Sequence, residues 1–130
     1  MKRKIYLSGA ITGRENYKEE FYKAKERLLK STKYSNYKLD LDIIVPCDYD
    51  YLNNTGKWED YLKTDIKMLV DCDVLVDIQN GSENSKGAML EKMIATALNI
   101  TIKTLEEYVD IIYNFYIYNS NNSDKEKCND

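Results

Sequence analysis

The stretch Asn84-Ser85-Lys86-Gly87-Ala88-Met89-Leu90-Glu91 is the segment around which this chain is organised, because it reads as a turn that opens a helix. Ser85 is a favourable N-cap, and Gly87 has no side chain to block an approach to the free amides of the first turn. The stretch therefore predicts a small anion-binding site. Counted from Gly87, positions that follow at spacings of four, three and four lie on one helical face. These residues are Gly87, Glu91, Ile94 and Leu98.

Glu91 is the acid on this otherwise apolar face. Because helical side chains lean toward the N-terminus, Glu91 is expected to point back over Gly87, toward whatever the first turn binds. The pattern also fits a surface glutamate beside a buried stripe that lies one position further round. On that second interpretation, Ser85 and Gly87 only cap the helix.

Short apolar runs alternate with amphipathic segments on both sides of this turn. Strands are expected over 4–8, 41–45, 74–78 and 100–102, and helices from Asn16 to about Ser31 and over 58–72, 85–98 and 105–118. This order predicts an α/β fold with a parallel sheet, helices on both faces and right-handed crossovers. Ligands bind such sheets beyond the C-terminal ends of the strands, where strand order reverses. The loop Gly9 to Gly13 and the turn at Ser85 are expected to meet there.

Turn chemistry supports some of these boundaries. Asn16 with Glu19, and Thr104 with Glu107, have the spacing of capping boxes, in which two side chains satisfy the free amides at a helix start. The stretch 49–57 is expected to be a loop. Residues 1–118 are interpreted as one domain, and residues 119–130 as a disordered tail because they are almost entirely polar.

Composition limits the classes of partner. The net charge of −3 and the scattered basic residues argue against nucleic acid and an anionic membrane, so a small molecule is the expected ligand. No apolar run or leader predicts membrane insertion or export, and a cytoplasmic protein is expected. Three unpatterned cysteines and the absence of histidine make a zinc site or a histidine-dependent mechanism improbable. Apolar residues ring most of the helix 105–118, which predicts a homo-oligomer that uses this helix.

Asp65 is a second acid on the apolar side of a predicted helix, 58–72. A pair of inward carboxyl groups allows one to act as an acid and the other as a nucleophile. Each residue also has a structural interpretation. On that interpretation, Asp65 simply accepts a hydrogen bond from a neighbouring amide or pairs with a lysine, and Tyr6 only fills the core. Trp58 and Tyr61 are then core residues or part of a pocket wall.

The motifs together resemble the nucleoside 2-deoxyribosyltransferase superfamily over about residues 4–103, closest to a branch of short, functionally unassigned proteins, many of them carried by phages. They are also similar to the 2'-deoxynucleoside 5'-phosphate N-hydrolases, which share the S-x-G-x-x-x-E spacing. The resemblance implies a Rossmann-like or flavodoxin-like three-layer sandwich with a parallel sheet of four to five strands. The residues that carry it are Ile5 to Gly13, Trp58, Tyr61, Asp65, Asp71 to Asp73, Glu83 to Ala88 and Glu91.

The resemblance also implies roles for individual residues. Glu91 would be the nucleophile and Asp65 the acid and base, in a retaining scheme that needs carboxyl groups roughly 5 Å apart. Tyr6 would orient Glu91, and no metal or cofactor is implied. Contacts to the base are expected from Trp58, Cys47 and Asp48. The implied substrate-binding residues are Gly9, Ala10, Ile11, Gly13, Trp58, Asn84, Ser85 and Gly87.

Three functions are compatible with the sequence. The first is cleavage of the N-glycosidic bond of a 2'-deoxyribonucleoside or its 5'-monophosphate, with water or a second base as acceptor. The second is a non-catalytic binder that senses or sequesters a nucleotide-derived ligand. The third is a structural or interaction protein built on the final helix, for which mutation of that helix matters and Glu91→Ala does not.

Overall fold

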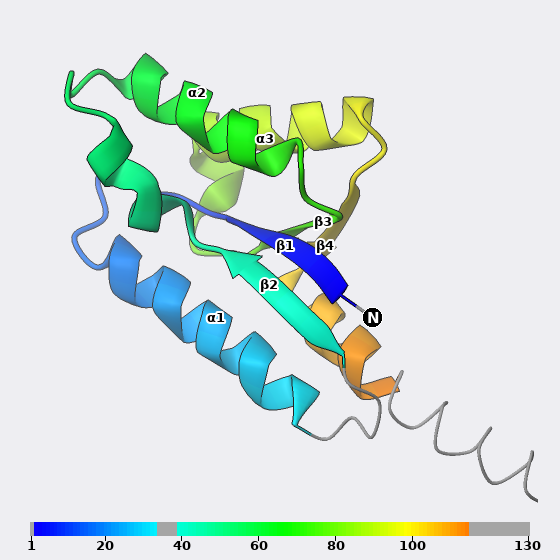
Figure 1. Ribbon diagram of the computed structural model, residues 1–130. Coiled ribbons are helices and arrows are strands. Elements are labelled where there is room, and N and C mark those ends of the chain that lie inside the picture. The colour runs from blue at the N-terminus through cyan, green and yellow to red at the C-terminus, as the bar shows by residue number, and fades with distance from the viewer. Residues whose placement is uncertain (1, 34–38, 115–130) are drawn as a thin grey trace, which may run out of the picture.

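A four-stranded parallel sheet is the centre of the computed structural model, which describes residues 2–33 and 39–114 (Figure 1). Its strands are β1 (Lys2–Ser8), β2 (Asp40–Ile44), β3 (Val74–Asp77) and β4 (Thr101–Thr104), in the order β2-β1-β3-β4. The helices are α1 (Tyr17–Thr32), α2 (Trp58–Leu69) and α3 (Lys86–Ala97), with short 3-10 helices η1 (Pro46–Leu52) and η2 (Ser82–Asn84). Residues 105–114 are also helical. The predicted α/β class and parallel sheet are confirmed.

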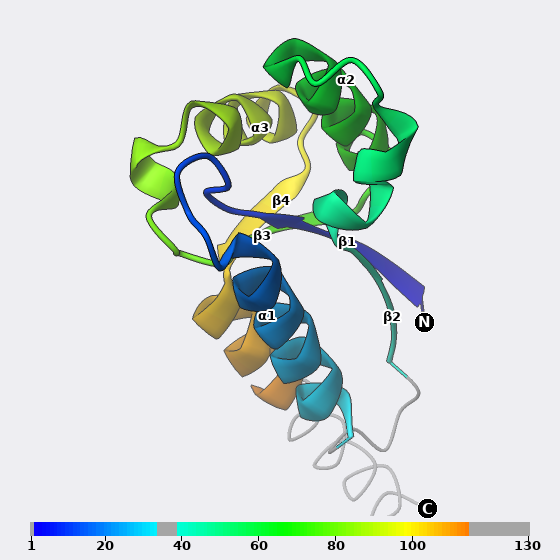
Figure 2. The same ribbon diagram turned by 90° about the vertical axis from the view of Figure 1, so that its left-hand side faces the viewer.

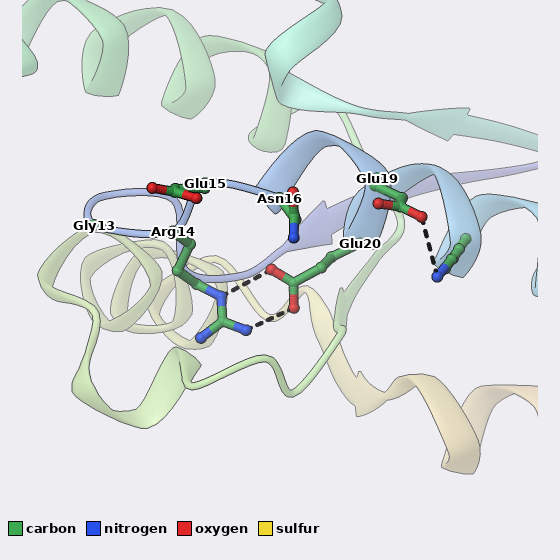
Figure 3. Close-up of a pocket in the computed structure, with 7 residues that line it drawn as sticks. Gly13, Arg14, Glu15, Asn16, Glu19 and Glu20 are labelled. Carbon is green, nitrogen blue, oxygen red and sulfur yellow. Dashed lines mark hydrogen bonds and ion pairs between the residues drawn. The ribbon is translucent and has the colours of Figure 1, made fainter.

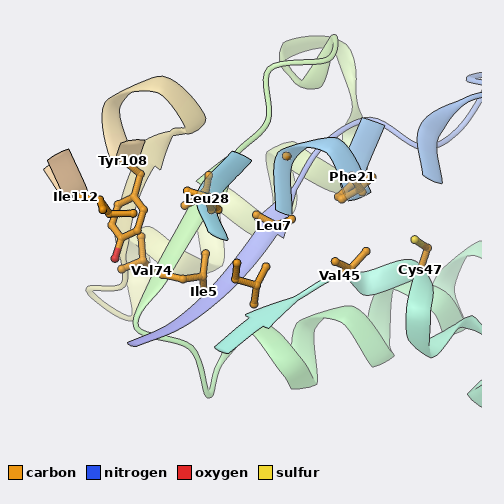
Figure 4. Close-up of a cluster of buried hydrophobic side chains, with 12 residues drawn as sticks. Ile5, Leu7, Phe21, Leu28, Val45, Cys47, Val74, Tyr108 and Ile112 are labelled. Atoms are coloured by element: carbon orange, nitrogen blue, oxygen red, sulfur yellow. The ribbon is translucent and has the colours of Figure 1, made fainter. Parts of the chain in front are cut away.

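Helices cover both faces of the sheet and give three layers (Figure 2). The helices α2 and α3 lie on one face, and α1 lies beside the helix 105–114 on the other. Side chains of β1 alternate between the layers: Ile5 and Leu7 pack with Phe21 of α1 (Figure 4), whereas Tyr6 packs with Leu69 of α2. Within residues 2–33 and 39–114, no helix has the length and apolar character needed to cross a membrane.

Several predicted boundaries differ from the structure. The prediction of a loop over 49–57 is wrong for residues 49–52, because they belong to η1. This helix begins at Pro46, whose fixed φ suits the first position of a helix. Asn16 does not cap α1 with its side chain, because its backbone (φ −103°, ψ 22°) is not extended and Glu19 instead pairs with Lys23 at 3.2 Å. The final part of the predicted helix, 115–118, and the predicted tail, 119–130, lie outside the described residues.

The other predicted capping box is confirmed. The backbone N–H of Thr104 donates to Glu107 Oε1 at 2.9 Å, and the N–H of Glu107 donates to Thr104 Oγ1 at 3.1 Å. The predicted cap of α3 is also present, because the N–H of Ala88 donates to Ser85 Oγ at 3.3 Å.

The loops after β1 and β3 meet at the C-terminal edge of the sheet, where strand order reverses between these two strands. The Asn80 side chain accepts a hydrogen bond from the backbone N–H of Ala10 at 2.7 Å and donates to its carbonyl at 2.9 Å. A Cβ at Gly9 would lie 2.7 Å from Ile78 Cγ1 and 2.9 Å from Asn80 Oδ1, so Gly9 permits this close approach. The predicted meeting of the two loops is confirmed.

Candidate active site

A cavity of about 980 Å³ opens at this edge of the sheet. Its walls come from the loop after β1, the start of α1, η1, α2 and the N-terminal half of α3. The volume falls within the range of small-molecule sites. The residues that line the cavity are Gly9, Ala10, Ile11, Thr12, Arg14, Tyr17, Asp50, Gly56, Trp58, Tyr61, Leu62, Asp65, Gly81, Asn84, Ser85, Lys86, Gly87, Ala88 and Glu91.

Glu91 is the most deeply buried acid of this cavity, with 6% of its surface exposed. The hydroxyl of Tyr6 donates to Glu91 Oε2, and Ser8 Oγ donates to Oε1 at 3.1 Å. Tyr6 and Ser8 are alternate residues of β1, so both side chains leave the same face of the strand. The sheet therefore holds both oxygens of the carboxyl group, and the interpretation of Glu91 as a surface residue is wrong.

The burial of Glu91 and Asp65 changes their ionisation. Burial raises the pKa of Asp65 to about 7, with a further contribution from the negative charge of Asp50. Burial raises the pKa of Glu91 to about 8, and the nearby Asp65 adds to the rise, while the hydrogen bonds from Tyr6 and Ser8 oppose it. Burial and the neighbouring Glu91 also raise the pKa of Tyr6, so this phenol keeps its proton as a donor. The two acids interact and titrate as a pair.

Most of the predicted site residues line the cavity: Glu91, Asp65, Gly9, Ala10, Ile11, Trp58, Asn84, Ser85 and Gly87. Tyr6 lies behind Glu91, as described above. Gly13 is the exception, because it does not line the cavity although its neighbours Thr12 and Arg14 do. It borders a separate hollow of about 360 Å³, where Arg14 forms a double hydrogen bond with Glu20 (Figure 3). The prediction that Gly13 belongs to this cavity is therefore wrong.

The structure also corrects the expected contacts to a base. Cys47 is buried in the core on the α1 face of the sheet, and Asp48 is exposed and accepts a hydrogen bond from the Tyr22 hydroxyl. Neither residue lines the cavity, whereas Asp50, two residues further along η1, does. Because η1 is a 3-10 helix and not a loop, the direction of its side chains was not readable from the pattern.

Ser8, Arg14, Asp50 and Lys86 are among the residues of the site that the sequence reasoning did not assign to it. Ser8 had a signal, since it follows Tyr6 by two residues in a strand and therefore shares its face. Lys86 lies at the start of α3, with its Nζ 5.0 Å from the centre of the Trp58 ring. Within the described part of the chain, no group of three or more His, Cys, Asp or Glu side chains is arranged to hold a metal ion.

Comparison with known proteins gives a family and a fold. Residues 3–104 match the family described as a domain of unknown function, DUF4406. No curated protein sequence matches significantly. Among the similar solved structures is a 2-deoxyribosyltransferase from the psychrotolerant bacterium Bacillus psychrosaccharolyticus, with a TM-score of 0.56 and 19% identity over 78% of this chain and 70% of that chain. At this identity the likeness shows a shared fold.

Proposed function

We propose that this chain, which belongs to the DUF4406 family, cleaves the N-glycosidic bond of a 2'-deoxyribonucleoside or of its 5'-monophosphate. The observation that carries the proposal is a buried Glu91, held through both carboxyl oxygens, that shares one cavity with Asp65. Two carboxyl groups in different environments suit glycosidic bond cleavage. The fold shared with a 2-deoxyribosyltransferase adds support.

In the proposed reaction, a Glu91 oxygen attacks the anomeric carbon, and the bond from that carbon to the base nitrogen breaks with its electron pair leaving on the base. Asp65 gives its proton to that nitrogen. The product is a deoxyribosyl ester on Glu91. In the second half, Asp65 takes a proton from water or from an acceptor base, whose lone pair attacks the anomeric carbon and releases Glu91 as a carboxylate.

This scheme needs one proton on the acid pair, and that proton must be on Asp65. The hydrogen bonds that Tyr6 and Ser8 donate to Glu91 favour its carboxylate form, whereas no hydrogen bond to the Asp65 carboxyl group is present among the described residues. Because the pKa of Glu91 (about 8) lies above that of Asp65 (about 7), the single proton is mainly on Glu91, and the reactive form with the proton on Asp65 is the minor one. The hydrogen bonds from Tyr6 and Ser8 increase the share of that reactive form. The activity is expected in the pH range where the pair holds one proton, near pH 7 to 8.

The cavity offers separate surfaces for the parts of such a substrate. Trp58 and Tyr61 supply aromatic wall against which a base can stack. The N-terminus of α3, with Ser85 and Gly87, offers backbone amides to the sugar or to a 5'-phosphate. A Cβ at Gly87 would approach no atom closer than Trp58 Cζ2 at 4.0 Å, so this part of the wall is open.

The test is the incubation of purified protein with a panel of deoxynucleosides and their 5'-monophosphates, with and without a free acceptor base, followed by chromatography of the released base. Wild-type protein is expected to release or exchange base, and Glu91→Gln and Asp65→Asn to lose this activity. The matched control is Glu83→Gln, which removes a carboxylate from an exposed position outside the cavity.

The outcomes separate the candidate functions. Release that needs no acceptor indicates a hydrolase, and exchange that depends on the acceptor indicates a transferase. Saturable binding without release by wild-type protein would instead favour a protein that senses or sequesters the ligand. Equal release by Glu91→Gln and wild type would exclude the proposed nucleophile.

Self-association through the final helix and a cytoplasmic location remain predictions. Ile111 is 43% exposed, whereas Tyr108 and Ile112 of the same helix are buried against the sheet. An Ile111→Glu variant is expected to lower the mass measured by light scattering if this face joins two copies. An unchanged mass would exclude that interface.

A further inference from the structure

Asp77, the last residue of β3, is a second buried carboxyl group on the sheet face that α3 covers. Its Oδ2 pairs with Nζ of Lys92, a residue of α3, at 2.6 Å. Its Oδ1 accepts hydrogen bonds from Ser82 Oγ at 2.6 Å and from the backbone N–H of Gln79 at 2.8 Å. Asp77 is only 6% exposed, and each of its carboxyl oxygens has at least one hydrogen-bond or ion-pair partner.

The sheet register places Asp77 beside a residue that contacts Glu91. Ser8 of β1 and Asp77 of β3 are paired residues of the parallel ladder. Ser8 donates to Glu91, and Asp77 pairs with Lys92, so neighbouring strand ends hold consecutive residues of α3. Rotation or sliding of α3 would break at least one of these contacts. The orientation of Glu91 is therefore fixed from two strands.

The same carboxylate also organises the loop that leads into α3. Gln79 adopts a left-handed conformation (φ +55°), which is unfavourable for a residue other than glycine. Its N–H and the hydroxyl of Ser82, the first residue of η2, both donate to Asp77. Because η2 ends at Asn84, directly before the Ser85 cap, Asp77 fixes the entry to α3 as well as its middle.

Asp77 and Glu91 have opposite ionisation behaviour although both are buried on this face. Burial acts to raise the pKa of Asp77, but the hydrogen bonds from Lys92, Ser82 and Gln79 outweigh it, so the pKa is lowered. An ionised Asp77 balances the charge of Lys92, which is the residue next to Glu91 in α3. The charged and titratable groups that act on Glu91 itself are Tyr6 and Asp65, and Lys92 is not among them.

We propose that Asp77 and Lys92 are a positioning pair that fixes the orientation of Glu91 and keeps the lysine charge away from its carboxyl group. The catalytic consequence rests on the function proposed above, whereas the effect on Glu91 itself does not. Neither Asp77 nor Lys92 lines the cavity, so the role of the pair is exerted through α3 and not through the substrate.

The test compares Asp77→Asn, Lys92→Gln and the double variant. Asp77→Asn keeps the shape of the side chain but removes the carboxylate that pairs with Lys92, the residue next to Glu91 in α3, and Lys92→Gln leaves the Asp77 carboxylate unbalanced. The control is Glu26→Gln, which removes an exposed ion pair with Lys30 (3.5 Å) on α1. The first readout is a carboxyl ¹³C NMR titration of Glu91, whose resonance is identified by its loss in Glu91→Gln. The second readout is kcat and KM for base release.

We expect the pKa of Glu91 to fall by about one unit in Asp77→Asn, because the Lys92 ammonium then lacks its partner and favours the carboxylate form of Glu91. We expect this pKa to rise in Lys92→Gln. The double variant returns this pKa toward the wild-type value. In both single variants kcat is expected to fall by about 10- to 100-fold, with a smaller change in KM, because the nucleophile is misplaced while the cavity wall remains.

An unchanged Glu91 titration in both single variants, together with kcat values equal to those of Glu26→Gln, would overturn the proposal. If Asp77→Asn does not fold, Lys92→Gln decides the outcome, since it retains the Ser82 and Gln79 contacts of Asp77. If wild-type protein releases no base but the titration shifts as expected, the proposed function fails and the positioning pair stands.

Discussion

Glu91→Gln should make the protein more stable, by an amount that grows with pH. Gln has the shape of Glu, and its amide group can still bond to the Tyr6 and Ser8 hydroxyls, which both donate and accept. The substitution therefore removes the charge of a buried group and leaves its contacts in place. The change isolates the free energy of burying the Glu91 carboxylate.

The magnitude follows from the ionisation of Glu91. Its pKa rises from an ordinary 4.5 to about 8 on folding. Between these values the folded protein keeps a proton that the unfolded chain has released, so the free energy of unfolding of the wild type falls as pH rises. At 1.36 kcal/mol per pKa unit, Glu91 lowers that free energy by about 3 kcal/mol at pH 7. Glu91→Gln removes this loss.

The assay is urea unfolding followed by fluorescence, at pH values from 5 to 8.5, for wild type, Glu91→Gln and Glu83→Gln. We expect the gap between Glu91→Gln and wild type to widen steadily toward pH 8, while Glu83→Gln follows the wild type because its carboxylate is exposed. A Glu91→Gln curve parallel to that of the wild type across the whole range would refute the description of Glu91 as a buried carboxyl group that is protonated at neutral pH.

Three further predictions concern other residues that line the cavity or hold Glu91. Tyr6→Phe removes a donor to Glu91, so the limb of the pH profile for kcat near pH 8, which follows Glu91, should move to higher pH, and kcat should fall by about tenfold or more. An unmoved limb would contradict this. Asp50→Asn removes a negative charge that raises the pKa of Asp65, so the limb near pH 7, which follows Asp65, should move to lower pH. A shift upward would exclude the interaction. Gly9→Ala should lower the free energy of unfolding, measured with urea, by about 1–3 kcal/mol, because the new Cβ would lie 2.7 Å from Ile78 Cγ1. The control is Gly87→Ala, whose new Cβ would lie no closer than 4.0 Å to any atom.

The sheet and its helices were predictable from the sequence because their signals are periodic and local. The apolar run of β3 and the alternation in β1 follow from burial on the two faces of the sheet, and the Thr104 and Glu107 capping pair follows from spacing alone. The turn into α3 was predictable for the same reason, since Ser85 is a local cap. These features depend on residues close together in the chain.

The contacts of the site depend on tertiary structure and were less predictable. Helical spacing placed Glu91 on an inward face, but the donors that hold it come from β1, more than eighty residues away. The Asp77 and Lys92 pair depends on which strands are neighbours and on their register, which no local pattern records. Asp50 was overlooked because a 3-10 helix has no strong apolar repeat.

The configuration at the anomeric carbon of the transfer product tests the central claim most directly. The reaction is run with a deoxynucleoside that wild-type protein cleaves and with methanol as acceptor, and the methyl deoxyriboside is analysed by proton NMR before it can isomerise. Attack by Glu91 followed by attack of the acceptor inverts the carbon twice, so we predict a product that retains the configuration of the substrate. An inverted product, or no cleavage of any nucleoside or nucleotide in the panel, would contradict the role of Glu91 as nucleophile.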